Sequence, residues 1–350
     1  MKYFALRASV LFFVVAAGCG PTQGPAQSGR FSKNPLPQGN TLSPGASSSR
    51  DTAIAVGELG TILRTTDGGG TWTIQDSGTT DKFLGVAFAD DSIGAAVGET
   101  ILQTTDGGTT WKRNYNWIAA AAVYFLDANN GWAVGGRNIL HTTNGGMTWT
   151  RQFQLPGLPK ELRGVSFVDG NNGWVVGLLA GGGTIYRTTD GGDTWTWQSN
   201  EYGYLNGVSF VDANTGWAVG GGSRIVPPLM YFGTIFNTSD GGTTWTRQWF
   251  GYGGDFYAVS FVDTNIGTVV GRSGRIFRTT DAGATWTYQE SGTTNTLYAV
   301  SFVDADTGIA VGESGTILST TDGGATWIAQ DSGTTNSLYG VSFAVAKAAP

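Results

Sequence analysis

The sequence predicts an all-β protein, a seven-bladed β-propeller of four-stranded antiparallel blades that is closed by pairing the C-terminal strand with the first blade. Three observations predict this fold. One octet recurs seven times, each copy lies among short apolar strands separated by turn residues, and the array begins and ends in the middle of a unit. Four short strands in every ~40 residues are typical of a propeller blade.

The octet first appears as TTDGGGTW, from Thr65 to Trp72, and its tryptophans recur every 38 to 50 residues. A carboxylate followed by glycines could bind a cation or a phosphate, or it could close a tight hairpin by accepting backbone hydrogen bonds. Asn144 keeps the acceptor oxygen without the charge, which favours the hairpin. The acidic or amide positions are Asp67, Asp106, Asn144, Asp190, Asp240, Asp281 and Asp322, and the tryptophans are Trp72, Trp111, Trp149, Trp195, Trp245, Trp286 and Trp327.

One complete unit runs from Leu297 to Gln330. LYAVSF, IAVG, TILSTT and TWIAQ are its four expected strands, and a turn opened by Asp304 joins the first two. Calcium binding is the alternative role for this recurrent aspartate, but turn formation explains it more simply. Its equivalents are Asp90, Asp127, Asp169, Asp212 and Asp263.

The two ends of the array predict a ring. The repeats begin at residues 52–60 with a second strand and end at residues 338–343 with a first strand. These incomplete units would complete one blade together, and ring closure would remove the open sheet edges that promote aggregation.

Composition limits the class of protein. The chain has 350 residues and a net charge of −6; 13% of residues are charged and 40% are hydrophobic, which excludes an extended disordered chain. No nucleic-acid partner is expected, because phosphate binding requires a basic field. With 56 glycines, tight turns are favoured over helices. The single cysteine cannot form an intrachain disulfide.

The N-terminal region predicts export. Residues 1–18 combine a basic start with a short apolar run, as in a signal peptide. Ala16-Ala17-Gly18 before Cys19 resembles the lipobox of bacterial lipoproteins, so we expect Cys19 to be lipidated and the chain to be anchored to a bacterial membrane. An ordinary signal peptide is the alternative. We expect residues 19–50 to form a flexible Pro/Gly/Ser-rich tether, residues 51–345 the propeller and residues 346–350 a tail.

The octet resembles the Asp-box, or BNR repeat, of sialidases, sortilin-type receptors, xyloglucanases and photosystem II stability/assembly factors. Its seven-fold count and the unit VSFVDADTGIAVGESGTILSTTDGGATW make residues 51–345 most similar to the assembly factors. The resemblance implies a non-enzymatic scaffold that binds a protein or peptide partner at the membrane. We expect a monomer.

A sialidase-like glycosidase is the alternative. Such enzymes have six blades, an arginine triad, a Tyr–Glu pair and an Arg-Ile-Pro motif, to which only Arg224-Ile225-Val226-Pro227 comes near. We predict no catalytic residues, metal or cofactor. The one histidine, His141, belongs to a variable polar set that we expect on an exposed strand position with a structural role; its equivalents are Arg64, Gln103, Arg187, Asn237, Arg278 and Ser319.

A partner site is expected where the repeats differ. The face opposite the Asp-boxes would carry an acidic sector of Glu58, Glu99 and Glu313, opposite a basic one, unless these charges are merely solvated. The insert from Gly221 to Gly233 is apolar and aromatic, which marks either a partner site or local packing. The predicted partner-binding residues are Arg224, Met230, Tyr231, Phe232, Tyr252, Tyr202, Tyr204, Arg137 and Arg272. Stacking on sugars and an inert surface or adhesion module are the other hypotheses.

Overall fold

Seven four-stranded antiparallel sheets form the fold, and the computed structural model describes residues 49–114, 119–155, 161–179, 182–201, 203–224 and 230–345. Blade 1 combines β28 (Leu338–Phe343) with β1 (Ala53–Gly57), β2 (Ile62–Thr65) and β3 (Thr73–Gln75). Blade 2 contains β4 (Phe83–Phe88), β5 (Gly94–Gly98), β6 (Ile101–Thr104) and β7 (Lys112–Asn114), and blade 3 contains β8 (Ala122–Phe125), β9 (Gly131–Gly135), β10 (Asn138–Thr142) and β11 (Thr150–Gln154).

The remaining blades follow in chain order. Blade 4 contains β12 (Glu161–Phe167), β13 (Gly173–Leu179), β14 (Gly182–Thr188) and β15 (Thr196–Glu201), and blade 5 contains β16 (Tyr204–Phe210), β17 (Gly216–Arg224), β18 (Met230–Thr238) and β19 (Thr246–Tyr252). Blade 6 contains β20 (Phe256–Phe261), β21 (Gly267–Gly271), β22 (Ile276–Thr279) and β23 (Thr287–Gln289), and blade 7 contains β24 (Leu297–Phe302), β25 (Gly308–Gly312), β26 (Ile317–Thr320) and β27 (Ile328–Gln330). Four 3₁₀ turns are η1 (Ser49–Asp51), η2 (Glu58–Gly60), η3 (Arg272–Gly274) and η4 (Glu313–Gly315).

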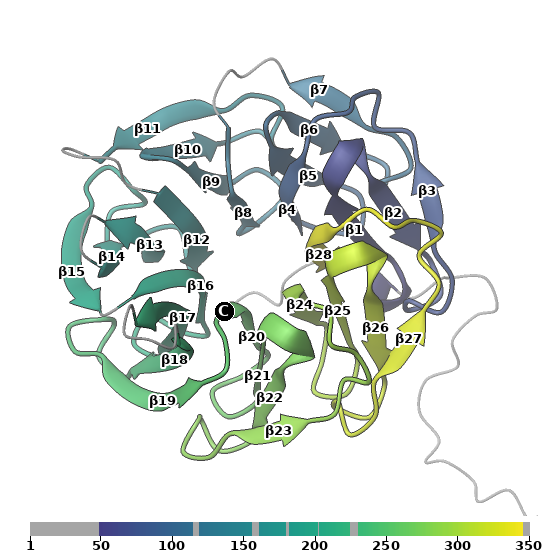
Figure 1. The fold of residues 1–350 in the computed structure, drawn as a ribbon. Coiled ribbons are helices and arrows are strands. Elements are labelled where there is room, and N and C mark those ends of the chain that lie inside the picture. Colours follow the sequence, from purple (N-terminus) through teal and green to yellow (C-terminus); the bar gives the residue numbers. More distant parts are fainter. Residues whose placement is uncertain are drawn as a thin grey trace, which may run out of the picture. The chain divides into compact units, whose positions relative to one another are not determined.

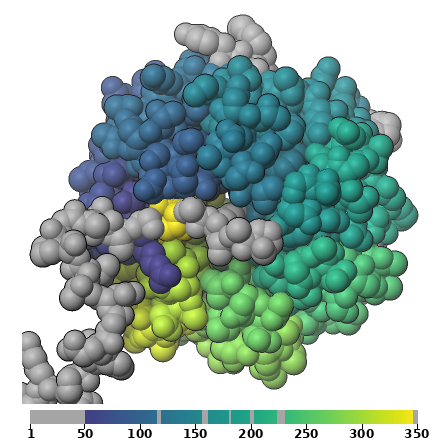
Figure 2. Space-filling model, turned by 180° about the vertical axis from the view of Figure 1, so that it is seen from behind, coloured from purple at the N-terminus to yellow at the C-terminus, as the bar shows by residue number. Residues whose placement is uncertain are grey.

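The blades close into a ring, as Figure 1 shows along the ring axis, and their first strands line a central channel. The predicted closure is confirmed: β28 pairs antiparallel with β1, with Ala53 opposite Phe343 and Val56 opposite Gly340. From behind, Figure 2 shows the first blade next to the last. Since β28 joins segments almost three hundred residues apart, one strand completes the whole ring.

The core lies between neighbouring blades rather than at a single centre. Every residue of second strands such as β1, β5 and β21 is buried, because both faces of these strands are covered by adjacent sheets. Each of the seven hydrophobic clusters therefore joins residues of successive blades, or of the last blade and the first.

Blades 3 to 6 are also joined by stacked aromatic rings. Trp132, Trp174 and Trp217 lie on second strands, and each stacks on a first-strand phenylalanine of the next blade, with ring centroids 3.5–3.6 Å apart. All three indoles are nearly inaccessible to solvent. The other blades have no tryptophan at this position, so the interfaces around the ring differ in composition.

The insert of blade 5 is a β-hairpin rather than an irregular loop. β17 and β18 are nine residues long and pair from Gly216 opposite Thr238 up to Arg224 opposite Met230. β17 and β18 are longer than the second and third strands of the other blades, and their extra residues lie on the side of the ring opposite the Asp-boxes.

Within the described residues, no helix is long and apolar enough to cross a membrane. The predicted signal peptide, Cys19, nearly all of the tether and the C-terminal tail lie outside the described residues.

Candidate partner-binding face

In the structure, the Asp or Asn side chain of each Asp-box octet accepts hydrogen bonds within its own hairpin. In blade 2, the Asp106 carboxylate accepts hydrogen bonds from the Thr110 amide and hydroxyl at 2.8 and 2.6 Å and from the Thr104 hydroxyl at 2.9 Å. Asn144 accepts the equivalent bond from the Thr148 amide at 2.9 Å, and its own amide group donates to the Thr148 hydroxyl at 2.9 Å. A neutral side chain thus makes the same clasp, which a site requiring negative charge would not allow.

The octet tryptophans complete each clasp. Trp72 and Trp111 donate their indole N–H groups to glycine carbonyls of their own octets at 3.1 Å. In blades 2 to 7, the box tryptophan also packs against the first-strand phenylalanine of its blade, with ring centroids 5.9–6.5 Å apart. The tryptophans of the octets therefore contribute to the packing of their blades.

Asp106→Ala is expected to lower the unfolding free energy by about 1 kcal/mol, because it leaves the Thr110 donors without an acceptor. Asp106→Asn should cost less, since blade 3 already uses asparagine. Burial acts to raise the pKa of Asp106, but the hydrogen bonds from Thr110 and Thr104 hold it below its ordinary value of 3.8. The extra stability that Asp106 gives over asparagine is therefore fully present above pH 3.8. It is lost as the pH falls through the lowered pKa of Asp106.

Thermal unfolding of the two Asp106 variants between pH 7 and pH 2 measures both the loss of stability and its dependence on pH. A larger loss of stability for the asparagine variant than for the alanine variant at neutral pH would contradict the clasp.

The recurrent turn aspartates also make backbone hydrogen bonds. Asp127 accepts from the amides of Asn129 and Asn130 at 2.7 and 2.8 Å, and the other first turns repeat the pattern. Among the described residues, no group of three or more His, Cys, Asp or Glu side chains is placed to hold a metal ion.

The expectation of an exposed position at His141 and its equivalents was wrong. None of these seven side chains is classed as exposed, and three of them reach the next blade. Arg64 and Gln103 each donate to a box carbonyl of the next blade at 2.8 Å, and Arg278 is only 9% exposed. His141 stacks on Trp132 with centroids 4.9 Å apart, and burial lowers its pKa. This packing supports the structural role expected for the histidine.

We call the side of the ring opposite the Asp-boxes the mouth face; there the second strand leads to the third and each blade leads to the next. Tyr204, Tyr231, Tyr252 and Arg272 lie on blades 5 and 6 of this face. Arg137 lies on blade 3, so blade 4 separates it from the others. Tyr202 lies outside the described residues, as do the side chains of Arg224 and Met230.

Phe232 requires a correction as a contact residue. Its ring is only 8% exposed and packs against Phe250, with centroids 5.1 Å apart. The exposed aromatic residues are instead Phe250 and Tyr252 on β19, at 44% and 45%. Phe232 supports this pair from within the blade.

An ion pair with a buried carboxylate lies where blade 5 leads into blade 6. The Asp255 side chain is 1% exposed, and the Nη2 atom of Arg272 lies 3.8 Å from its carboxylate. Neither carboxylate oxygen has a hydrogen-bond partner of normal geometry among the described residues. Burial raises the pKa of Asp255, and interactions with Tyr204 and Arg272 only partly oppose that. The Arg272 guanidinium also lies over the Tyr231 ring, 4.2 Å from its centroid.

Three tyrosines outside the predicted partner-binding set line the channel mouth. Tyr257, Tyr298 and Tyr339 occupy the same position in β20, β24 and β28, and we call them the tyrosine arc. Their ring centroids are 5.3 and 4.8 Å apart in that order. They border a cavity of about 270 Å³ whose other side is lined by Arg163 and Asn206. The repeated motif of Phe or Leu, Tyr, then Ala or Gly before VSF could have identified them.

The glutamates of the predicted acidic sector lie on three adjacent blades, 7, 1 and 2. Glu58, Glu99 and Glu313 each accept a hydrogen bond from a backbone amide just before a first strand, at 3.4, 3.4 and 3.2 Å. Glu58 also accepts a bond from the Tyr339 hydroxyl at 2.7 Å, and that bond acts to lower the pKa of Glu58. Each glutamate therefore has a structural role in addition to its charge.

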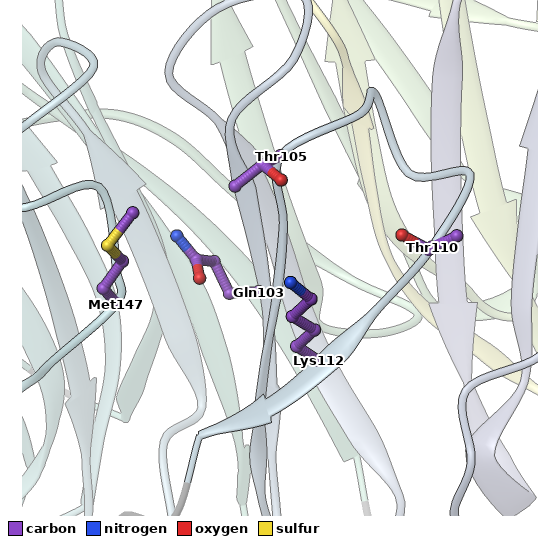
Figure 3. A pocket seen from close by; sticks show the side chains of 5 residues that line it. All are labelled: Gln103, Thr105, Thr110, Lys112 and Met147. Atoms are coloured by element: carbon purple, nitrogen blue, oxygen red, sulfur yellow. The ribbon is translucent and has the colours of Figure 1, made fainter.

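Two further hollows lie away from the mouth face. The other end of the channel forms a cavity of about 800 Å³ lined by the valines, serines and phenylalanines of the first strands. Figure 3 shows a smaller recess in which Gln103, Thr105 and Lys112 lie opposite Met147. The Gln103 amide in this recess already donates to the Gly145 carbonyl, so the recess is part of the interface between blades 2 and 3.

The closed ring, the seven Asp-box clasps and the irregular mouth face define a seven-bladed Asp-box propeller with its variable chemistry on one side. A family model described as photosynthesis system II assembly factor YCF48 matches residues 71–202 and 279–347, more than half of the chain. The chain belongs to this family.

Solved structures share the fold. YCF48 bound to D1 peptide is 20% identical, with a TM-score of 0.54 over 80% of this chain and 84% of that one. YCF48 from Cyanidioschyzon merolae is 21% identical, with a TM-score of 0.52 over 71% and 84%. The GH74 xyloglucanase from Xanthomonas campestris is 14% identical, with a TM-score of 0.60 over 85% of this chain but 53% of the enzyme. A comparison with curated proteins gave no match.

Proposed function

We propose that this chain is a non-catalytic, lipid-anchored propeller that binds an extended segment of a partner protein on its mouth face. Membership of a family described as assembly factors supports a protein partner, as does the relative solved with a D1 peptide. The observation that carries the proposal is that blade 5 exposes Phe250 and Tyr252, while Tyr231 and Arg272 lie together at its border with blade 6. Aromatic residues and arginine are enriched at protein interfaces.

The binding surface that we propose is centred on β19 and η3. Phe250 and Tyr252 project from β19, and Arg275 donates to the Tyr252 carbonyl at 3.1 Å, which ties this strand to blade 6. Arg272 is held by Asp255 and Tyr231, so its guanidinium is already positioned. A surface of this kind loses little side-chain entropy when a partner binds.

The double variant Phe250→Ser/Tyr252→Ser is expected to reduce capture of the partner from membrane extracts about tenfold, because two anchor rings are lost. Its melting temperature should stay within about 4 °C of the original, since both rings are already half exposed. Tyr288→Ser is the matched control: Tyr288 is 50% exposed on β23, an outer strand of blade 6. If both variants captured partner as well as the original protein, blades 5 and 6 would not form the site.

A carbohydrate ligand is the second candidate, favoured by the tyrosine arc, because sugars stack on aromatic rings. Glycoside hydrolysis also needs two carboxyl groups about 5–9.5 Å apart on either side of a bound sugar. Glu58, Glu99 and Glu313 each accept a hydrogen bond from a backbone amide just before a first strand, so each already has a structural role. Binding without hydrolysis is therefore the form of this alternative that fits the residues, and a glycan array would test it.

We also propose that Cys19 carries the lipid, on the basis of the apolar run and small residues that precede it. Cys19→Ala is expected to move the protein from the membrane fraction to the aqueous fraction and to abolish labelling by radioactive palmitate. Cys19→Ser would be the closest steric control and should behave in the same way. Labelling that persisted in either variant would contradict lipidation at this residue.

A further inference from the structure

The tyrosine arc forms one continuous aromatic surface at the channel mouth. Figure 1 shows β20, β24 and β28 successively around the channel, and their first halves carry the three rings. Tyr257 interacts with Arg272 at one end, so the arc continues the surface of blade 6. Burial and neighbouring negative charge raise the pKa values of Tyr298 and Tyr339 to about 12, and the hydroxyls therefore stay protonated and neutral.

The arginines near the arc have acidic partners, whereas the glutamates near it lack ion pairs of their own. Arg163 pairs with Glu161 at 2.7 Å, and Arg272 pairs with Asp255 at 3.8 Å, so both arginines already have acidic partners. Glu58 and Glu313, beside the arc, have no lysine or arginine within 4 Å in the described part of the chain. Lys82 interacts with Glu58, so on the side of the mouth formed by blades 7 and 1 the carboxylate left without a nearby basic group, among the described residues, is Glu313.

The protein already places one cation on this surface. The Lys82 ammonium group lies 3.9 Å from the centroid of the Tyr339 ring and interacts with the Glu58 carboxylate, which bonds the Tyr339 hydroxyl at 2.7 Å. A ring face next to a carboxylate is a favourable environment for an ammonium or guanidinium group. The long aliphatic stems of lysine and arginine also pack well on aromatic rings.

We propose that the tyrosine arc, together with Glu58 and Glu313, binds a lysine or arginine side chain of the partner segment. The apolar stem lies along Tyr298 and Tyr257, and the cationic head reaches the Glu313 carboxylate and the Tyr298 hydroxyl. The stem would enter the cavity of about 270 Å³ that the three tyrosines border, and the head would lie outside it, because neither glutamate lines this cavity. This inference rests on the proposed function, and it specifies the chemistry of the partner: an extended segment with a basic residue.

The test measures binding of the full chain to a labelled Gly/Ser peptide containing several arginines, and to the same peptide with glutamine in their place. We expect at least tenfold tighter binding of the arginine peptide at low salt, and a smaller difference at high salt. Glu313→Gln should weaken binding severalfold while keeping the bond to the Thr296 amide, because glutamine retains an acceptor oxygen. Tyr298→Ala should weaken it about tenfold.

Asp193→Asn is the matched control, since it removes one negative charge from an exposed residue in the Asp-box of blade 4, on the opposite face. Equal binding of the two peptides, or equal effects of Glu313→Gln and Asp193→Asn, would overturn the inference. Glycan binding that depends on Tyr298 without salt sensitivity would also overturn it. If partner capture still depends on Phe250 and Tyr252 in those cases, the proposed function stands and only the basic residue is wrong.

Discussion

A chain that ends before Leu338 is expected to fail to form a monomeric, cooperatively folded ring. The deletion removes β28, and β1 then loses the ladder that runs from Ala53 opposite Phe343 to Gly57 opposite Leu338. It also removes Leu338, Val341 and Phe343 from the core between blades 7 and 1. A typical domain is stable by only ~5–15 kcal/mol, so losing a whole ladder and three core side chains is expected to prevent cooperative folding, and an open sheet edge is exposed.

Size-exclusion chromatography and circular dichroism measure this outcome. We expect aggregated or partly unfolded protein from the truncated chain, and partial recovery when a peptide of residues 338–345 is added. Deleting only residues 346–350, the predicted tail, is the control and should leave folding intact. A truncated chain that remained monomeric with an unchanged melting temperature would show that closure by β28 does not hold the ring together.

Trp174→Ala is expected to lower the unfolding free energy by about 3–5 kcal/mol, the usual cost of removing a buried aromatic ring. Trp174 is fully buried, stacks on Phe210 with centroids 3.5 Å apart and donates its indole N–H to the Gly241 carbonyl at 2.9 Å. The substitution removes all three contributions between blades 4 and 5. Guanidinium unfolding measured by circular dichroism gives the change directly.

Trp197→Ala is the matched control within the same blade. Trp197 is 51% exposed on β15, so its replacement should change the unfolding free energy by no more than about 0.5 kcal/mol. If the two variants lost similar stability, the stacked tryptophans between blades would not be principal contributors to the core.

The fold could be predicted because its determinants repeat. The sequence contains seven octets and seven first strands, and the array begins with the second strand of a unit. This pattern leaves few alternatives to a ring closed by β28. The Asn144 copy even distinguished a neutral clasp from a charged site. The environment of Arg64 and Arg278 could not be predicted, because their burial depends on how neighbouring blades pack, and polar residues at a variable strand position resemble solvent-exposed ones.

The candidate site could be predicted only in part. Aromatic letters in an insert do not show which rings face solvent, and the extension of β17 and β18 into a hairpin places Phe232 inside while Phe250 and Tyr252 project outward. The tyrosine arc comes from three successive first strands, and the packing of these strands side by side brings the rings together. The repeated motif that contains these tyrosines is present in the sequence, but the sequence does not show that the three rings meet at the mouth of the channel.

Cross-linking mass spectrometry of the captured partner tests most directly whether the Asp-boxes are framework and the mouth face is the binding surface. We expect cross-links and protection from labelling at Tyr252, Arg272 and Tyr298, with the octet residues unaffected. Protection centred on the Asp-box hairpins, such as Asp106 to Trp111, with no change at the mouth face, would contradict the assignment.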